Sequence, residues 1–153
     1  MNIEENLKNH RIELEDASTP AGNYVPYIIT NKLVFISGQL PFKQGKIPIT
    51  GVVGETVSSE EAIEMAKLCA LALISQLKSS CDGDLNKVSR VVKLGGFVAS
   101  ASSFTSQPTI INGASDIMVK AFGEQGKHSR FAVGVSSLPL NAPVEIEGIF
   151  ELK

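Results

Sequence analysis

The fold is decided by the stretch His128-Ser129-Arg130-Phe131-Ala132-Val133-Gly134-Val135 and, after a loop, Val144-Glu145-Ile146-Glu147-Gly148-Ile149-Phe150. In both runs apolar side chains recur at every second residue, which is the period of a β-strand. Arg130 and Glu145 occupy the alternate positions, so we expect them to share the sheet face opposite the core. Ala132 and Gly134 lie on the same face as Arg130 and would leave space above the backbone. A guanidinium, a carboxylate and open space predict a site for a small acid.

The rest of the chain predicts helices over about 1–10, 58–80 and 108–122, and strands over 27–30, 33–37 and 88–98. Ser58 and Glu61 form a capping-box pattern at the start of the clearest helix, and the first helix is expected to dock only loosely. The order of elements after the first helix favours an α+β fold, a mixed β-sheet with two helices packed on one face. Several outward strand positions are apolar or small, which predicts a homo-oligomer with the site near a subunit boundary.

Composition narrows the class of protein. The chain has 153 residues, of which 43% are hydrophobic and 20% are charged, which suits one domain over 1–153 with an N-terminal extension over 1–17. A net charge of −2 gives no electrostatic reason to expect nucleic acid. With no membrane-length apolar run and no basic-then-apolar signal pattern, a cytoplasmic protein is expected. Two cysteines and two histidines, widely separated, make a zinc site unexpected, and no cofactor is expected.

Three motifs in order resemble the RidA (YjgF/YER057c/UK114) family, whose members also carry the labels endoribonuclease L-PSP and translation inhibitor. They are Pro20-Ala21-Gly22-Asn23-Tyr24, Ile36-Ser37-Gly38-Gln39-Leu40-Pro41, and Arg130-Phe131-Ala132-Val133 with Ser136, Leu138-Pro139 and Val144-Glu145-Ile146-Glu147. The resemblance covers about 18–152. It implies a chorismate-mutase-like fold, a homotrimer with clefts between subunits, and hydrolytic deamination of reactive 2-enamine or 2-imino acids to 2-keto acids and ammonia.

The resemblance also implies roles for two residues in catalysis. Arg130 would grip the carboxylate of the substrate, because its planar fork matches a carboxylate in a way that lysine cannot. Glu145 would position or activate the attacking water. An imine beside a carboxylate is already electrophilic, so the reaction needs positioning and a water but no cofactor.

Four further residues are expected to bind the substrate. Tyr24 would supply a hydroxyl and a ring wall, and Asn112 matches the family's site asparagine if one extra residue before Arg130 is allowed. Gly38 and Ala132 would contribute backbone groups where a small side chain permits close approach. The chain departs from the family pattern at Ala132, where cysteine is typical, and at the neighbouring Phe131 and His128.

Other interpretations remain open on the residues alone. Arg130 and Glu145 could form a structural ion pair on neighbouring strands. The same cleft could bind or sense a 2-keto acid without turning it over. RNA cleavage is the third possibility, and the acidic pI and the absence of a basic stripe argue against it.

Overall fold

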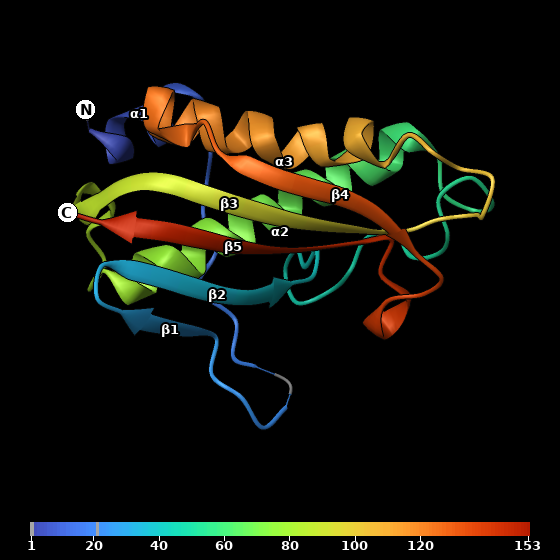
Figure 1. The fold of residues 1–153 in the computed structure, drawn as a ribbon, viewed down its shortest axis with the longest axis horizontal. Coiled ribbons are helices and arrows are strands. Elements are labelled where there is room, and N and C mark those ends of the chain that lie inside the picture. The colour runs from blue at the N-terminus through green and yellow to red at the C-terminus, as the bar shows by residue number, and fades with distance from the viewer. Residues whose placement is uncertain (1, 21) are drawn as a thin grey trace.

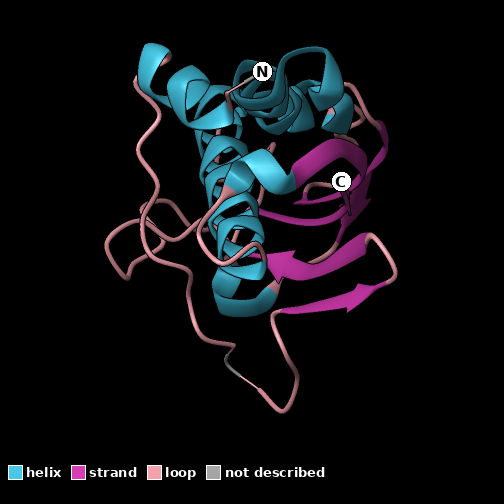
Figure 2. Ribbon diagram, turned by 90° about the vertical axis from the view of Figure 1, so that its left-hand side faces the viewer, coloured by secondary structure: helices cyan, strands magenta, loops and turns pink. Residues whose placement is uncertain are grey.

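The computed structural model describes residues 2–20 and 22–153 and contains a five-stranded sheet with helices on one side of it. The strand order across the sheet is β1-β2-β5-β3-β4, in which only the β3–β4 pair is parallel (Figure 1). Figure 2 shows the helices on one side of the sheet and no helix on the other. The predicted α+β fold is confirmed. The helices are α1 (Ile3–Asn9), α2 (Ser59–Ser80) and α3 (Gln107–Phe122), and the strands are β1 (Tyr27–Thr30), β2 (Leu33–Gln39), β3 (Val88–Ala99), β4 (Ser129–Val135) and β5 (Val144–Leu152).

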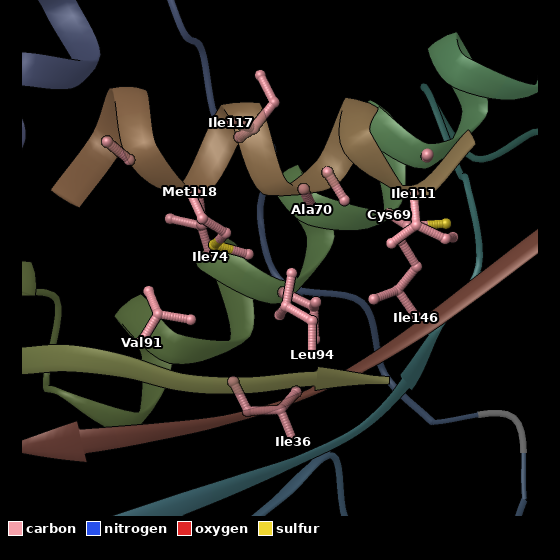
Figure 3. Packing of buried hydrophobic residues seen from close by; sticks show 14 of the residues in the cluster. Ile36, Cys69, Ala70, Ile74, Val91, Leu94, Ile111, Ile117, Met118 and Ile146 are labelled. Atoms are coloured by element: carbon pink, nitrogen blue, oxygen red, sulfur yellow. The ribbon is translucent and has the colours of Figure 1, made fainter. Parts of the chain in front are cut away.

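Helix α2 forms the central layer of the core. It begins where the Ser58 side chain accepts a hydrogen bond from the Glu61 backbone N–H, as the capping pattern predicts. Its inward residues recur at helical spacing and are fully buried against the sheet and against α3 (Figure 3). These residues include Ala62, Ala66, Cys69, Leu73 and Leu77.

Helix α3 lies close to helix α2 and to strand β3 because a glycine at each contact leaves room for it. A Cβ at Gly113 would lie 2.6 Å from the backbone oxygen of Ile63 in α2, and a Cβ at Gly96 in β3 would lie 2.6 Å from the side chain of Ile111. The close approach at Gly96 is therefore an approach of helix α3 to the sheet. As a result, helix α3 contacts both β3 and the edge strand β4.

We expect Gly113→Ala to lower the free energy of unfolding by about 1–2 kcal/mol, because overpacking outweighs the roughly 1 kcal/mol gain in helix propensity. Urea unfolding gives this difference from the transition midpoint. Asp116→Ala, at an exposed position of the same helix, should change stability by less than about 0.5 kcal/mol. A Gly113→Ala protein at least as stable as the wild type would show that α2 and α3 can separate at no cost.

Helix α1 is firmly docked, so the prediction of a loosely held first helix is wrong. Ile3 and Leu7 are 1% and 4% exposed. The backbone N–H of Ile3 donates to the Asn86 side chain at 3.0 Å, and Asn6 Nδ2 donates to the carbonyl of Ala121 at 3.0 Å. Two apolar side chains and two long-range hydrogen bonds fix this segment against the helix layer.

The register of the sheet places Arg130 and Glu145 on opposite faces, so the prediction of a shared face is wrong. Arg130 is paired with the buried Leu94 of β3, and the two therefore point toward the helices. Glu145 is paired with Phe97 on the other side. Alternation with a period of two divides the side chains of a strand between its two faces, but it does not indicate which face is turned toward the core. The apolar side chains of β4, which we expect from the sequence to face the core, point away from the helices.

The helix-free face of the sheet carries apolar side chains in the open. Ile28, Phe35 and Val133 are between 42% and 55% exposed, and their strand partners place them on the side away from α2 and α3. Such a face is unusual for a surface that meets only water. Among the helices of the described residues, none is long and apolar enough to cross a membrane.

Candidate functional site

Arg130 lies on the edge strand β4 and extends its side chain across the first turns of α3. Its Nη1 donates to Ser115 Oγ at 3.1 Å, and its Nη2 donates to the carbonyl of Pro108 at 3.2 Å. Both acceptors are neutral. Within residues 2–20 and 22–153, no carboxylate lies within ion-pairing distance of this partly buried guanidinium. The positive charge is thus anchored by neutral oxygens and is left to attract an anion.

Ser115 and His128 complete the surroundings of the arginine. His128 Nε2 lies 2.9 Å from Ser115 Oγ, and His128 Nδ1 lies 2.6 Å from the carbonyl oxygen of Gly126. Burial lowers the pKa of His128 below its ordinary value, and the nearby charge of Arg130 lowers this pKa further, whereas the Gly126 contact raises it. The pKa of His128 is lowered on balance, which favours the neutral imidazole.

Asn112 belongs to the same neighbourhood by helical spacing. It lies four residues after Pro108 and three before Ser115, so the three residues form one stripe on α3. Arg130 contacts the first and last members of this stripe. The structure therefore brings Arg130 and Asn112 to one side of the molecule, as the motif-based prediction requires.

The expected open space beside Arg130 is partly filled. A Cβ at Gly134 would lie 2.8 Å from both Gln107 Nε2 and Ser100 Oγ. Ala132 packs against the hydrophobic core, and its cross-strand partner Gly96 is covered by Ile111. The small residues of β4 therefore make room for α3 rather than for a ligand.

Tyr24, Gly38 and Glu145 form a second group, in which Gly38 is the residue next to both of the others. Tyr24 and Gly38 line a small cavity of about 90 Å³ together with Leu140. The Glu145 carboxylate lies directly over Gly38, where any Cβ would overlap it. Gly38 of the second motif is therefore required because the Glu145 carboxylate approaches it closely, and not because of its backbone conformation. Ala21, within the first motif, lies outside the described residues.

The Glu145 carboxyl group is held in an environment that favours its neutral form. Burial raises its pKa above the ordinary glutamate value, and the like charge of Glu147 on the same face raises this pKa further. A carboxylate with a raised pKa is a stronger base than a free glutamate, and it can exchange protons closer to neutral pH.

The two groups do not meet within one chain. Arg130 is on the helix side of β4, whereas Glu145 is on the helix-free side of β5, and β3 separates the two strands. The alternative of a structural ion pair on neighbouring strands is therefore contradicted as well. Each group has its own scaffold: α3 and β4 hold the first, and β2 and β5 hold the second.

Among the described residues, neither the other cavity nor a metal centre brings further candidate residues to the site. The larger cavity, about 420 Å³, lies over α2 and α3 and contains none of the predicted site residues; its lining includes Arg11, Lys43, Leu68, Ile117 and Lys120. Residues 2–20 and 22–153 contain no cluster of three or more His, Cys, Asp or Glu side chains arranged to hold a metal ion.

The sequence analysis did not identify Ser115 as a site residue and assigned no role in the site to His128. A signal was present in the spacing, because Pro108, Asn112 and Ser115 share one helical stripe and Ser115 is the hydroxyl on it. The contact of His128 with this stripe depends on the parallel pairing of β3 with β4, which brings the end of the α3–β4 connection back against the helix.

Comparison with known proteins identifies relatives over almost the whole chain. The family model described as "YjgF/chorismate_mutase-like, putative endoribonuclease" matches residues 4–151. Protein TCP17 of Trypanosoma cruzi is 43% identical over 96% of this chain and 92% of its own length. A crystal structure of a protein of unknown function from Agrobacterium tumefaciens has a TM-score of 0.92 with 46% identity, covering 99% of this chain and 92% of that one. TdcF of E. coli, solved with bound serine, shares the fold with a TM-score of 0.66 and 21% identity, covering 92% and 97% of the two chains.

Proposed function

Because this chain belongs to the YjgF (RidA) family, we propose that it hydrolyses reactive 2-enamine and 2-imino acids to 2-keto acids and ammonia. The observation that carries the proposal is the state of Arg130. Its guanidinium is anchored by two neutral oxygens and has no carboxylate partner among the described residues. A small molecule with a carboxylate supplies the missing charge. TdcF shows that this fold can hold an amino acid, since its structure contains serine.

The active unit in this proposal is a homotrimer with clefts between subunits. The Arg130 group and the Glu145 group lie on opposite faces of one sheet, so a single cleft can contain both only if two copies contribute. The exposed apolar side chains Ile28, Phe35 and Val133 supply a surface that a second copy would bury. In each cleft, one subunit provides Arg130 and Asn112, and its neighbour provides Glu145, Gly38 and Tyr24.

The reaction then needs few groups. Arg130 binds the carboxylate of the substrate and orients the adjacent imine carbon. Glu145, in its ionised form, removes a proton from a water whose oxygen attacks this carbon. That proton passes to the nitrogen, which gives a neutral carbinolamine. The hydroxyl proton of the carbinolamine then moves to the nitrogen as the C=O bond forms and the C–N bond breaks, so that ammonia leaves and the 2-keto acid remains. An enamine first gains a proton on carbon to become the imine. Tyr24 and Asn112 line the cleft, and the backbone at Gly38 contacts the ligand, whereas Ala132 packs against the core and is left out of the proposed site.

Turnover is the decisive test of this proposal. Freshly generated 2-iminopropionate should disappear faster with the protein than in buffer, and pyruvate and ammonia should form in equal amounts. Binding of 2-oxobutyrate, a stable 2-keto acid, is measured in parallel. Binding without turnover would instead support the non-catalytic sensing module.

We also propose a cytoplasmic location, which the two buried free cysteines, Cys69 and Cys81, support.

A further inference from the structure

The hydrogen bonds around Arg130 have a fixed direction that begins at Gly126. The Gly126 carbonyl oxygen can only accept a hydrogen bond, and it lies 2.6 Å from His128 Nδ1. Nδ1 must therefore carry a proton. In a neutral imidazole the other nitrogen, Nε2, then holds a lone pair and acts as an acceptor.

Ser115 receives its orientation from this imidazole. With Nε2 as an acceptor 2.9 Å away, the Ser115 hydroxyl must be the donor. Its hydrogen is thereby directed away from Arg130, and the oxygen lone pairs remain for the Arg130 Nη1–H at 3.1 Å. A serine without this histidine could rotate its hydroxyl hydrogen toward the guanidinium, where a donor would face a donor.

The second anchor of the guanidinium lies closer to the N-terminus of helix α3. Arg130 Nη2 donates to the carbonyl of Pro108, seven residues before Ser115 and about two helical turns away. The two terminal nitrogens are thus held at two points on α3, which fixes the plane of the guanidinium. A guanidinium carries about five N–H donors, and these anchors engage one on each terminal nitrogen, so the others remain for a ligand.

We propose that Gly126, His128 and Ser115 form a positioning relay that sets the orientation of Arg130 toward a carboxylate ligand. The identification of that ligand as the substrate rests on the proposed function, but the relay itself does not. His128 and Ser115 are positioning residues in this proposal, since neither contacts the reacting atoms. The histidine fixes the serine, the serine fixes the arginine, and the arginine binds the ligand.

The tautomer of His128 tests the relay without any assay of activity. Nitrogen-15 NMR of the imidazole at neutral pH should show Nδ1 protonated and Nε2 unprotonated. In Ser115→Ala the Nε2 signal should shift toward that of a free lone pair, while Nδ1 stays protonated. A wild-type His128 with its proton on Nε2, or with both nitrogens protonated at neutral pH, would overturn the proposal.

Ligand affinity tests whether the relay acts through Arg130. Ser115→Ala and His128→Ala should each weaken 2-oxobutyrate binding about tenfold, the effect of loosening one hydrogen bond to a charged group. For imine hydrolysis KM should rise by a similar factor while kcat stays within about threefold. Ser115→Thr keeps the hydroxyl and should restore most of the affinity. Ser129→Ala is the matched control. Ser129 directly precedes Arg130 in the sequence, but its hydroxyl donates to the Val92 carbonyl and takes no part in the relay.

The outcomes separate this inference from the proposed function. A protein that binds 2-oxobutyrate without turnover would end the proposed function, yet the affinity series would still test the relay. Wild-type affinity in Ser115→Ala, or an equal loss in Ser129→Ala, would refute the relay while leaving hydrolysis intact. Circular dichroism of each variant must match the wild type, and Ser115→Thr keeps the test valid if His128→Ala fails to fold.

Discussion

Arg130→Ala should lower kcat/KM for 2-iminopropionate by roughly 100- to 1000-fold, the effect of removing one partner of a hydrogen-bonded charge pair. Without the guanidinium, the substrate carboxylate enters a partly buried site with no counter-charge, and its imine carbon is no longer held in place. Arg130→Lys should recover little of this loss, because an ammonium keeps the charge but cannot offer a planar pair of donors. The initial rate of pyruvate formation above the uncatalysed rate gives the measurement.

The fold should survive the loss of this side chain. The guanidinium is bonded only to Ser115 and Pro108 on the helix surface, so the thermal midpoint and the oligomer size of Arg130→Ala should match those of the wild type. Arg11→Ala is a suitable control, because Arg11 is exposed and belongs to neither residue group. Wild-type turnover in Arg130→Ala would remove the arginine from the mechanism.

Glu145→Gln should lower kcat by about 100- to 10,000-fold, the range for loss of a general base, and should change 2-oxobutyrate affinity by less than about threefold. Glutamine has the same shape and can still pack over Gly38, so the change removes the base without opening a cavity. An unchanged kcat would show that water is activated by another group.

The pH profile tests the state of Glu145 more finely. A general base works when ionised, so kcat/KM should fall as the pH drops through the pKa of Glu145. Burial raises this pKa first, and Glu147 raises it further. Glu147→Gln removes the second cause and should move the acid limb of the profile to lower pH, while Glu145→Gln should lose this limb. If the rate instead fell as the pH rose through the same value, Glu145 would be acting as an acid.

Mixing the two inactive variants tests whether one cleft needs two copies. In oligomers reassembled from equal amounts of Arg130→Ala and Glu145→Gln chains, about a quarter of the clefts should combine an intact arginine from one chain with an intact glutamate from its neighbour. Activity should therefore return to about a quarter of the wild-type value. If both residues worked within a single chain, no mixture would recover activity.

The elements of this fold could be predicted because their signals are local. The capped start of α2, its apolar stripe and the alternation in β4 and β5 each depend on residues within a few positions of one another. The position of β3 between β4 and β5 could not be predicted in the same way, because strand order depends on pairings distant in sequence. For that reason the alternation predicts β4 and β5 as strands but does not predict which face of each strand is turned toward the helices.

The candidate site was predicted in part for a similar reason. Motif positions identified Arg130 and Asn112, and Tyr24, Gly38 and Glu145, and the structure places these residues in two groups. Nothing in the spacing indicated that the groups lie on opposite faces. The contact of His128 with Ser115 depends on how the chain returns from α3 into the parallel strand β4, and alternation within a strand carries no information about it.

The firm docking of α1 affects the order in which the chain can reach its native state during synthesis. Ile3 and Asn6 find their hydrogen-bond partners 83 and 115 positions later, at Asn86 and Ala121. Ile3 and Asn6 are therefore among the last of these residues to reach their final positions, since their binding surface does not exist until α3 has been synthesised. Until then the apolar side chains of Ile3 and Leu7, which are buried in the finished fold, remain exposed to water.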